Sequence, residues 1–97
     1  MITQHQKQQI VQIVRPHEPV RIGIFGSYAR GENHAESDLD VLIRLKNGIS
    51  LLQLVALEQN LSEQLGVKVD LVTEGALKNL RLKNYIEQDL ISIFHEA

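Results

Sequence analysis

The amino-acid sequence predicts one α/β domain over residues 1–97, built on a three-stranded mixed sheet with helices packed mainly on one face. Three observations predict it. The chain has 97 residues, which is close to the commonest size of a single domain. Stretches with helical spacing of apolar residues alternate with stretches of period two, in the order αβαβαβα. Each of the three candidate strands carries one purely aliphatic face, so helices on that side leave the other face partly open.

The composition excludes several classes of protein. There is no cysteine, so disulfide frameworks and cysteine-based metal sites are excluded, and nothing ties the chain to an oxidising compartment. No apolar run approaches the roughly 20 residues that span a bilayer, so we expect no membrane association and a cytoplasmic location. The net charge of −2 comes from mixed charges without a basic excess, so we expect no direct nucleic-acid binding.

The first part of the chain is expected to form a helix, a strand and a short helical turn. The first helix ends before Pro16, because proline disfavours helical geometry in the residue before it. Its apolar residues have helical spacing: Ile10, Val11, Ile13 and Val14. Residues 20–25 then alternate with period two, and the strand that they form ends at Gly26 and Ser27. Gly31 is a candidate end for the short helix that follows.

Residues 38–45 form the second expected strand, and its two faces differ in chemistry. One face is aliphatic and consists of Leu39, Val41, Ile43 and Leu45. The other face carries charge and consists of Asp38, Asp40, Leu42 and Arg44. The strand therefore places its carboxylates on the face that the helices leave open.

A long helix and a third strand are expected next. Ser50 and Gln53 have the spacing of a capping box at the start of the helix, and Gly66 suits a left-handed cap at its end. Five leucines form its apolar stripe: Leu51, Leu54, Leu57, Leu61 and Leu65. Residues 67–72 then alternate as a strand, with Asp70 on its polar face.

A single final helix, with Thr73 as its N-cap, is expected to complete the chain. Its buried stripe is expected to comprise Leu82, Tyr85, Ile86, Leu90, Ile93 and Phe94. We interpret this stripe as core, with partial exposure to a partner protein as the alternative. Tyr28 has two interpretations as well, namely core packing and a wall of a ligand site.

Three of the four aspartates fall on the polar face of the sheet. Asp38 and Asp40 stand two apart on one strand, so their side chains point the same way, about 6–7 Å apart at the α-carbons. Such a pair is either a polar strand end that pairs with lysine or a metal site. Oxygen-only ligation suits Mg²⁺ or Mn²⁺, with Asp70 on the neighbouring strand as a third ligand.

The glycine-containing segment before these aspartates points to phosphate binding. Gly26 and Ser27 follow a strand directly, which lets the backbone approach a ligand closely and adds a hydroxyl donor. Arg30, one turn further on, either meets the phosphates or pairs with Glu32 or Glu36. The segment is not a P-loop, because Glu32 stands where that motif requires lysine.

These motifs together resemble the DNA polymerase β-like nucleotidyltransferase superfamily, and most of all its minimal nucleotidyltransferases, the MNT proteins. The family pattern is a Gly-Ser at the end of the first strand, an Asp-x-Asp on the second and a third Asp on the third. The matching segments occur in that order and lie at residues 26–31, 37–40 and 69–71. The resemblance covers nearly the whole chain, and it implies the minimal nucleotidyltransferase fold.

The resemblance also implies a function. Such proteins commonly occur as the antitoxin of HEPN/MNT toxin–antitoxin systems, and members transfer AMP from ATP to a tyrosine of the HEPN-domain toxin. Carried over to this chain, Gly26 and Ser27 hold the triphosphate, Asp38 and Asp40 hold two Mg²⁺ ions, and Asp70 holds the catalytic one, with Mn²⁺ as the alternative metal. We therefore expect a protein adenylyltransferase that uses ATP and forms a hetero-oligomer with a HEPN-domain toxin.

The expected reaction is in-line attack of an acceptor hydroxyl on the α-phosphate, with pyrophosphate as the leaving group. Asp70 either accepts the hydroxyl proton or keeps the attacking oxygen on its metal. Two alternatives stay open: an antitoxin that masks its toxin by binding alone, and a catalytic subunit that serves another acceptor through a separate substrate-binding chain. Three clustered carboxylates favour an enzyme, because binding alone gives no reason to gather like charges.

Overall fold

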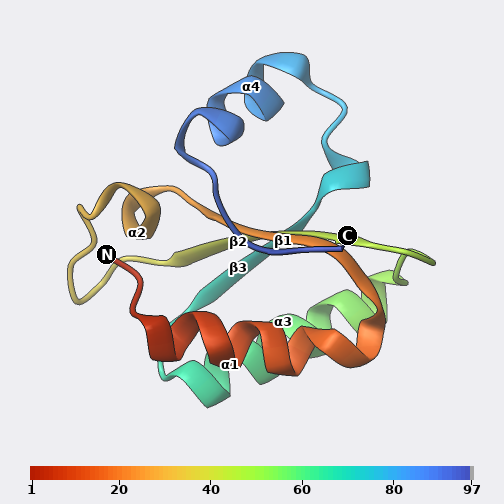
Figure 1. The fold of residues 1–97 in the computed structure, drawn as a ribbon, viewed down its shortest axis with the longest axis horizontal. Coiled ribbons are helices and arrows are strands. Elements are labelled where there is room, and N and C mark those ends of the chain that lie inside the picture. The colour runs from red at the N-terminus through yellow and green to blue at the C-terminus, as the bar shows by residue number, and fades with distance from the viewer. Residues whose placement is uncertain (97) are drawn as a thin grey trace.

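Four strands, rather than the three expected, form one mixed sheet in the order β3–β2–β1–β4 (Figure 1). They are β1 (Pro19–Phe25), β2 (Leu39–Leu45), β3 (Val69–Thr73) and β4 (Ile91–His95). β1 lies antiparallel to both β2 and β4, whereas β2 and β3 are parallel. The computed structural model describes residues 1–96, and it confirms the mixed α/β architecture.

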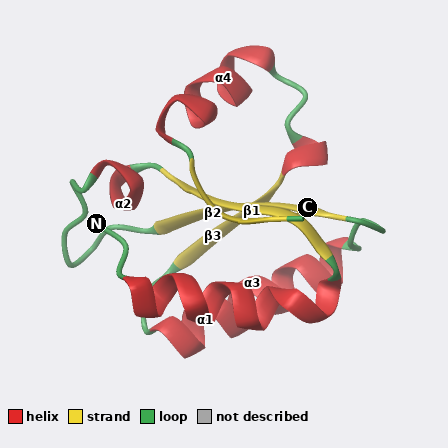
Figure 2. Ribbon diagram, in the orientation of Figure 1, coloured by secondary structure: helices red, strands yellow, loops and turns green. Residues whose placement is uncertain are grey.

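The long helices lie on both sides of this sheet, unequally. α1 (Gln4–Val14) and α3 (Leu51–Leu65) lie side by side on one face, and α4 (Leu80–Asp89) lies across the other side (Figure 2). The remaining helical segments are short: α2 (Ser27–Arg30), η1 (Arg15–His17) and η2 (Glu74–Ala76). Within residues 1–96, none of the helices has the length and apolar character needed to cross a bilayer.

The hydrophobic core fills the space between the sheet and helices α1 and α3. The aliphatic strand faces predicted from sequence are buried there, each residue at most 5% exposed: Ile22, Ile24, Leu39, Val41, Ile43, Val69 and Leu71. Tyr28 is also buried in this core, so packing is its role. Leu42 and Ile86 are buried outside this cluster, which indicates that α4 covers the middle of the face expected to be open.

Helix α3 begins and ends as the sequence predicts, but its apolar stripe starts later. Ser50 and Gln53 form the capping box, and Gly66 adopts the left-handed conformation at the C-terminus. Leu51, predicted in the stripe, is 74% exposed. At about 100° per residue, the spacing of the leucines drifts, so that Leu51 lies roughly 80° around the helix from Leu61. The core-facing stripe therefore begins one turn further along.

The C-terminal region corrects the prediction of one final helix with Thr73 as its N-cap. Thr73 ends β3 and leads into a single 3₁₀ turn, and its side chain caps no helix. Helix α4 is capped instead by Asn79, whose Oδ1 accepts hydrogen bonds from the backbone N–H groups of Arg81 and Leu82 at 2.9 and 3.4 Å. Residues Ile91–His95 form β4 and pair with the edge of β1.

The change from helix to strand at Leu90 has a non-local cause. Leu90 is extended, and the residues after it satisfy the backbone hydrogen bonds of β1 that would otherwise form an open edge. Ile93 and Phe94 do pack against the core, as predicted, but from a strand. Leu82 and Tyr85, also predicted to be buried, are 48% and 61% exposed. The helical stripe was therefore wrong for these two residues.

Candidate active site

The loop at the end of β1 lies directly against the start of β2. Phe25, the last residue of β1, is paired with Asp40. Gly26 has φ 71° and ψ −153°, a conformation that L side chains rarely adopt. A Cβ at Gly26 would overlap Oδ2 of Asp40 and lie 3.2 Å from its Cγ. Glycine is therefore required here on two counts, and its absence of a side chain brings the loop backbone against a carboxylate.

The helical turn after this loop is as short as the sequence suggests. Ser27 begins α2, and Gly31 ends it in the left-handed conformation with φ 74°. The backbone N–H groups of Ala29 and Arg30 bond to the carbonyl of Gly26. These bonds hold the Gly26–Ser27 corner in a fixed shape next to Asp40.

The three predicted aspartates gather at the N-terminal ends of β2 and β3. Asp40 is the direct neighbour of Asp70 in the parallel register of the two strands, which lie about 4.8 Å apart in such a pair. Asp38 stands just before β2, and its Oδ2 lies 3.8 Å from Nζ of Lys68. Both of those side chains are largely exposed, so this ion pair contributes little. The lysine-pairing interpretation thus applies to Asp38 alone.

The surroundings of Asp40 disfavour the negative charge of its carboxylate. Burial is the largest cause of a rise in the pKa of Asp40 from 3.8 to about 6; the negative charges of Asp70 and Asp38 contribute to the same rise, and the charge of Arg30 opposes it. Oxygen-only carboxylate ligands suit hard ions such as Mg²⁺. Among the described residues, however, no three side chains of His, Cys, Asp or Glu converge on one point. The donor set therefore fits an ion held by one or two carboxylates at a time, with substrate phosphates completing its ligands, as Mg²⁺ usually is.

Arg30 resolves one of the alternatives left by the sequence. Its Nε lies 3.0 Å from Oε2 of Glu32, and its Nη1 lies 2.8 Å from Oδ2 of Asp89 at the end of α4. Hydrogen bonds with Glu32 and Asp89 raise the pKa of Arg30 above its ordinary value. Glu36 is not its partner. In this structure, Arg30 therefore links α2 to α4.

An open pocket of about 440 Å³ joins these parts. It is lined by the loop after β1, by two of the aspartates and by residues from the following loop and α4: Phe25, Gly26, Ser27, Arg30, His34, Ser37, Asp38, Asp40 and Tyr85. Asp70 lies next to this pocket through its pairing with Asp40. Tyr85 is the lining residue that sequence reasoning placed wrongly, because the helical stripe assigned it to the core.

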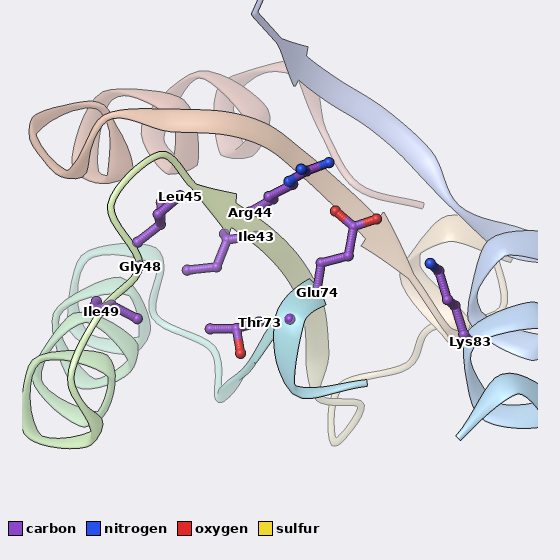
Figure 3. A pocket seen from close by; sticks show the side chains of 9 residues that line it. Ile43, Arg44, Leu45, Gly48, Ile49, Thr73, Glu74 and Lys83 are labelled. Carbon is purple, nitrogen blue, oxygen red and sulfur yellow. The ribbon is translucent and has the colours of Figure 1, made fainter. Parts of the chain in front are cut away.

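A second pocket, of about 530 Å³, lies at the far end of the same sheet face (Figure 3). It is lined by Arg44 of β2, Glu74 of η2 and Lys83 of α4, together with the turn at Gly48. Oε1 of Glu74 lies 3.1 Å from Nη1 of Arg21, and its Oε2 is buried without a hydrogen-bond partner among residues 1–96. Unlike the first pocket, this one contains none of the three predicted aspartates.

Comparison with known proteins identifies a family and relatives of this chain. The family model described as "Nucleotidyltransferase domain" matches residues 7–93. A protein of Methanocaldococcus jannaschii named "Putative protein adenylyltransferase" is 45% identical over 93 residues, covering 88% of this chain and 95% of the relative. "Protein adenylyltransferase MntA" of Thermococcus cleftensis is 41% identical over 80 residues, covering 81% of this chain and 76% of the relative.

The fold is also shared with a solved structure described as the tri-AMPylated Shewanella oneidensis HEPN toxin in complex with MNT antitoxin. The TM-score is 0.80 with 20% sequence identity, and the match covers 98% of this chain and 74% of the other. At that identity, the match shows the architecture, which is the one that the resemblance implied.

Proposed function

Because the chain belongs to the nucleotidyltransferase domain family, we propose that it is an antitoxin that transfers AMP from ATP to a tyrosine hydroxyl of a HEPN-domain toxin. One observation carries the proposal: Asp40 lies between the backbone of Gly26 on one side and the carboxylate of Asp70 on the other. The loop corner at Gly26 and Ser27 thus shares one pocket with Asp38 and Asp40, and Asp70 lies next to that pocket. The name of the Thermococcus cleftensis relative, a protein adenylyltransferase, supports AMP as the transferred group. The description of the structural neighbour, an AMPylated HEPN toxin with its antitoxin, supports a toxin as the acceptor.

Each side chain has a defined part in the proposed reaction. The backbone of Gly26 and the hydroxyl of Ser27 bind the triphosphate tail. Asp38 and Asp40 would hold the two Mg²⁺ ions, or Mn²⁺ in their place, and Asp70 would be a further ligand of the catalytic ion. Bound divalent ions neutralise the phosphate charge and lower the pKa of a coordinated hydroxyl.

The proposed reaction balances as a single displacement. The tyrosine oxygen forms a bond to the α-phosphorus while the bond from that phosphorus to the β-phosphate oxygen breaks, and pyrophosphate leaves. Asp70 accepts the tyrosine proton, or positions the oxygen while water accepts it. Arg30 becomes a phosphate ligand only if it leaves Glu32 and Asp89, so in the proposal it binds after the triphosphate has entered.

The decisive experiment combines the purified protein with its HEPN-domain partner, Mg²⁺ and ATP labelled at the α-phosphate. Label should appear on the toxin, and ATP labelled at the γ-phosphate should give none. Replacement of the toxin's accepting tyrosine by phenylalanine should abolish labelling. Full inhibition of the toxin without label would show that the chain masks its partner by binding alone. Label on a different protein would show a separate acceptor.

A further inference from the structure

Tyr85 is an aromatic side chain in the catalytic pocket that the proposed reaction does not use. It projects from α4, which lies across the open side of the sheet (Figure 1). Its side chain lines the same pocket as Gly26, Ser27 and Asp40, and the residue is 61% exposed. An exposed aromatic ring beside this loop offers an apolar face against which a ligand can pack.

Three rings line that pocket, and they are not equally available. Phe25 is partly buried and lies within β1. The ring of His34 is engaged, because its Nδ1 accepts a hydrogen bond from the backbone N–H of Glu36 at 3.2 Å. The side chain of Tyr85 forms no hydrogen bond within residues 1–96. Tyr85 is therefore the ring whose face is free to meet a ligand.

The helix that carries Tyr85 is fixed at both ends. Asn79 caps its start, and Asp89 at its end bonds to Arg30 at 2.8 Å. The neighbouring residue Ile86 is 4% exposed and anchors the helix to the sheet. The helix that carries Tyr85 is therefore in place beside the loop before any ligand binds, which lowers the entropy lost on binding. Asn79 and Ile86 continue to hold this helix when Arg30 leaves Asp89 in the proposed reaction.

The surroundings of Tyr85 extend beyond the catalytic pocket. A shallower hollow of about 570 Å³ lies on α4 and also uses Tyr85 as a wall. Its other lining residues are mostly amides and apolar groups: Asn79, Arg81, Leu82, Asn84 and Gln88. Tyr85 thus stands between a pocket with phosphate and metal ligands and a hollow with hydrogen-bonding amides, which are the groups that a nucleoside requires.

We propose that the ring of Tyr85 stacks on the nucleobase of the bound nucleoside triphosphate. The proposal rests on the proposed function, because the triphosphate on Gly26 and Ser27 and the α-phosphate at Asp40 place the nucleoside beside that pocket. The base then covers the free ring face. Stacking on an aromatic side chain tolerates every base, so Tyr85 provides affinity for the nucleoside rather than a choice of base.

The test measures binding of α,β-methylene-ATP, which cannot transfer AMP, and of inorganic triphosphate, both with Mg²⁺, by isothermal titration calorimetry. Tyr85→Leu should weaken binding of the nucleotide about 10-fold, which corresponds to about 1.4 kcal/mol, and leave binding of triphosphate unchanged. Tyr85→Phe should bind both as the wild type does. Leu80→Ala is the matched control, because Leu80 is 74% exposed on the same helix but lines neither hollow.

Four outcomes would overturn the proposal. Equal affinity of Tyr85→Leu and wild type for the nucleotide would show that Tyr85 does not stack on the base. Parallel loss of nucleotide and triphosphate would show a structural effect on the loop. Loss in Tyr85→Phe as large as in Tyr85→Leu would assign the effect to the hydroxyl group. If the wild type binds neither probe, the proposed function fails first, and the stacking fails with it.

An independent readout uses the tyrosine fluorescence of a chain that has no tryptophan. Tyr28 is buried in the core and Tyr85 is exposed, so they differ in access to a ligand. Nucleotide binding should quench emission in wild type and not in Tyr85→Phe, although both bind. Quenching that persists in Tyr85→Phe would place the base elsewhere.

Discussion

The two ends of the open sheet face use the same strand positions for opposite purposes. At one end, Asp40 of β2 is paired with Asp70 of β3, so like charges are neighbours. Four residues further along the chain from these aspartates lie Arg44 of β2 and Glu74, which directly follows β3; there Glu74 is paired with Arg21 at 3.1 Å. The first end is left with negative charge that a ligand must neutralise, while the second neutralises its buried carboxylate internally. Charge that the protein does not balance therefore marks the functional end.

The largest effect should follow from removal of the unbalanced charge. Asp40→Asn should lower AMP transfer about 1000-fold, because it removes a ligand of metal ions whose stabilisation of the transition state is worth several kcal/mol. The fold should persist, since the variant loses only a repelled carboxylate. Rates of labelling of the toxin, with circular dichroism as the check on folding, provide the measurement. Transfer at a wild-type rate would show that Asp40 holds no essential metal.

The next effect concerns the contact that places the loop against Asp40. Gly26→Ala should abolish measurable nucleotide binding and lower the free energy of unfolding by about 1–2 kcal/mol, because the new Cβ meets the carboxylate and φ is positive. Gly48→Ala is the matched control. Gly48 also has positive φ, but a Cβ there meets nothing within 4 Å.

Gly48→Ala should therefore destabilise the fold by about 1 kcal/mol and leave nucleotide binding intact. Urea unfolding and calorimetry on both variants separate strain from site geometry. Equal binding by Gly26→Ala and Gly48→Ala would mean that the close approach at Asp40 has no role in ligand binding.

Substitutions at the end of the sheet where Arg21 pairs with Glu74 should change the stability of the fold and not nucleotide binding. Arg21→Met should lower the free energy of unfolding by about 2 kcal/mol, because it leaves the largely buried carboxylate of Glu74 without its cation. Arg44→Met, at an exposed arginine without an ion pair among residues 1–96, should change it by less than about 0.5 kcal/mol. Both variants should keep their nucleotide affinity. A loss of affinity in Arg21→Met would show that the two ends are coupled.

The smallest effect is a pH dependence of stability without divalent ions. The pKa of Asp40 is raised from 3.8 to about 6 in the folded state, so the folded protein binds the proton more tightly than the unfolded chain does. The resulting stabilisation is complete below pH 3.8 and is lost as the pH rises through 6. Asp40→Asn should therefore melt at a higher temperature than wild type at pH 8, with a smaller difference at pH 4. A constant difference across this range would contradict the raised pKa.

Sequence reasoning worked best where short-range chemistry decides the structure. The capping box at Ser50 and the left-handed Gly66 bound α3, and alternation in two strands places Asp40 and Asp70 on the same face of the sheet. The sequence contains a further local signal, at the start of α1, that the prediction did not use. Thr3 and Gln6 form a capping box at the start of α1 and could have fixed its first residue.

The C-terminal region could not be predicted in the same way, because its structure depends on a distant partner. Residues 90–94 fit both a helical stripe and a period of two, and the vacant edge of β1 decides between them. Helix α4 ends at Asp89 instead of continuing, so the predicted single helical stripe does not form. Arg30 has one partner that the sequence predicted, Glu32, and a second, Asp89, that is 59 residues away and beyond the reach of any local pattern.

The most direct test of the account is the Mg²⁺ dependence of binding of α,β-methylene-ATP to wild type and Asp40→Asn. The central claim is that the carboxylates beside the Gly26 loop hold the ions that bind the nucleotide. Wild type should bind the nucleotide with Mg²⁺ and lose that binding on chelation, and Asp40→Asn should bind weakly under both conditions. Equal affinity of wild type with and without Mg²⁺, or equal affinity of the two proteins with it, would contradict the claim.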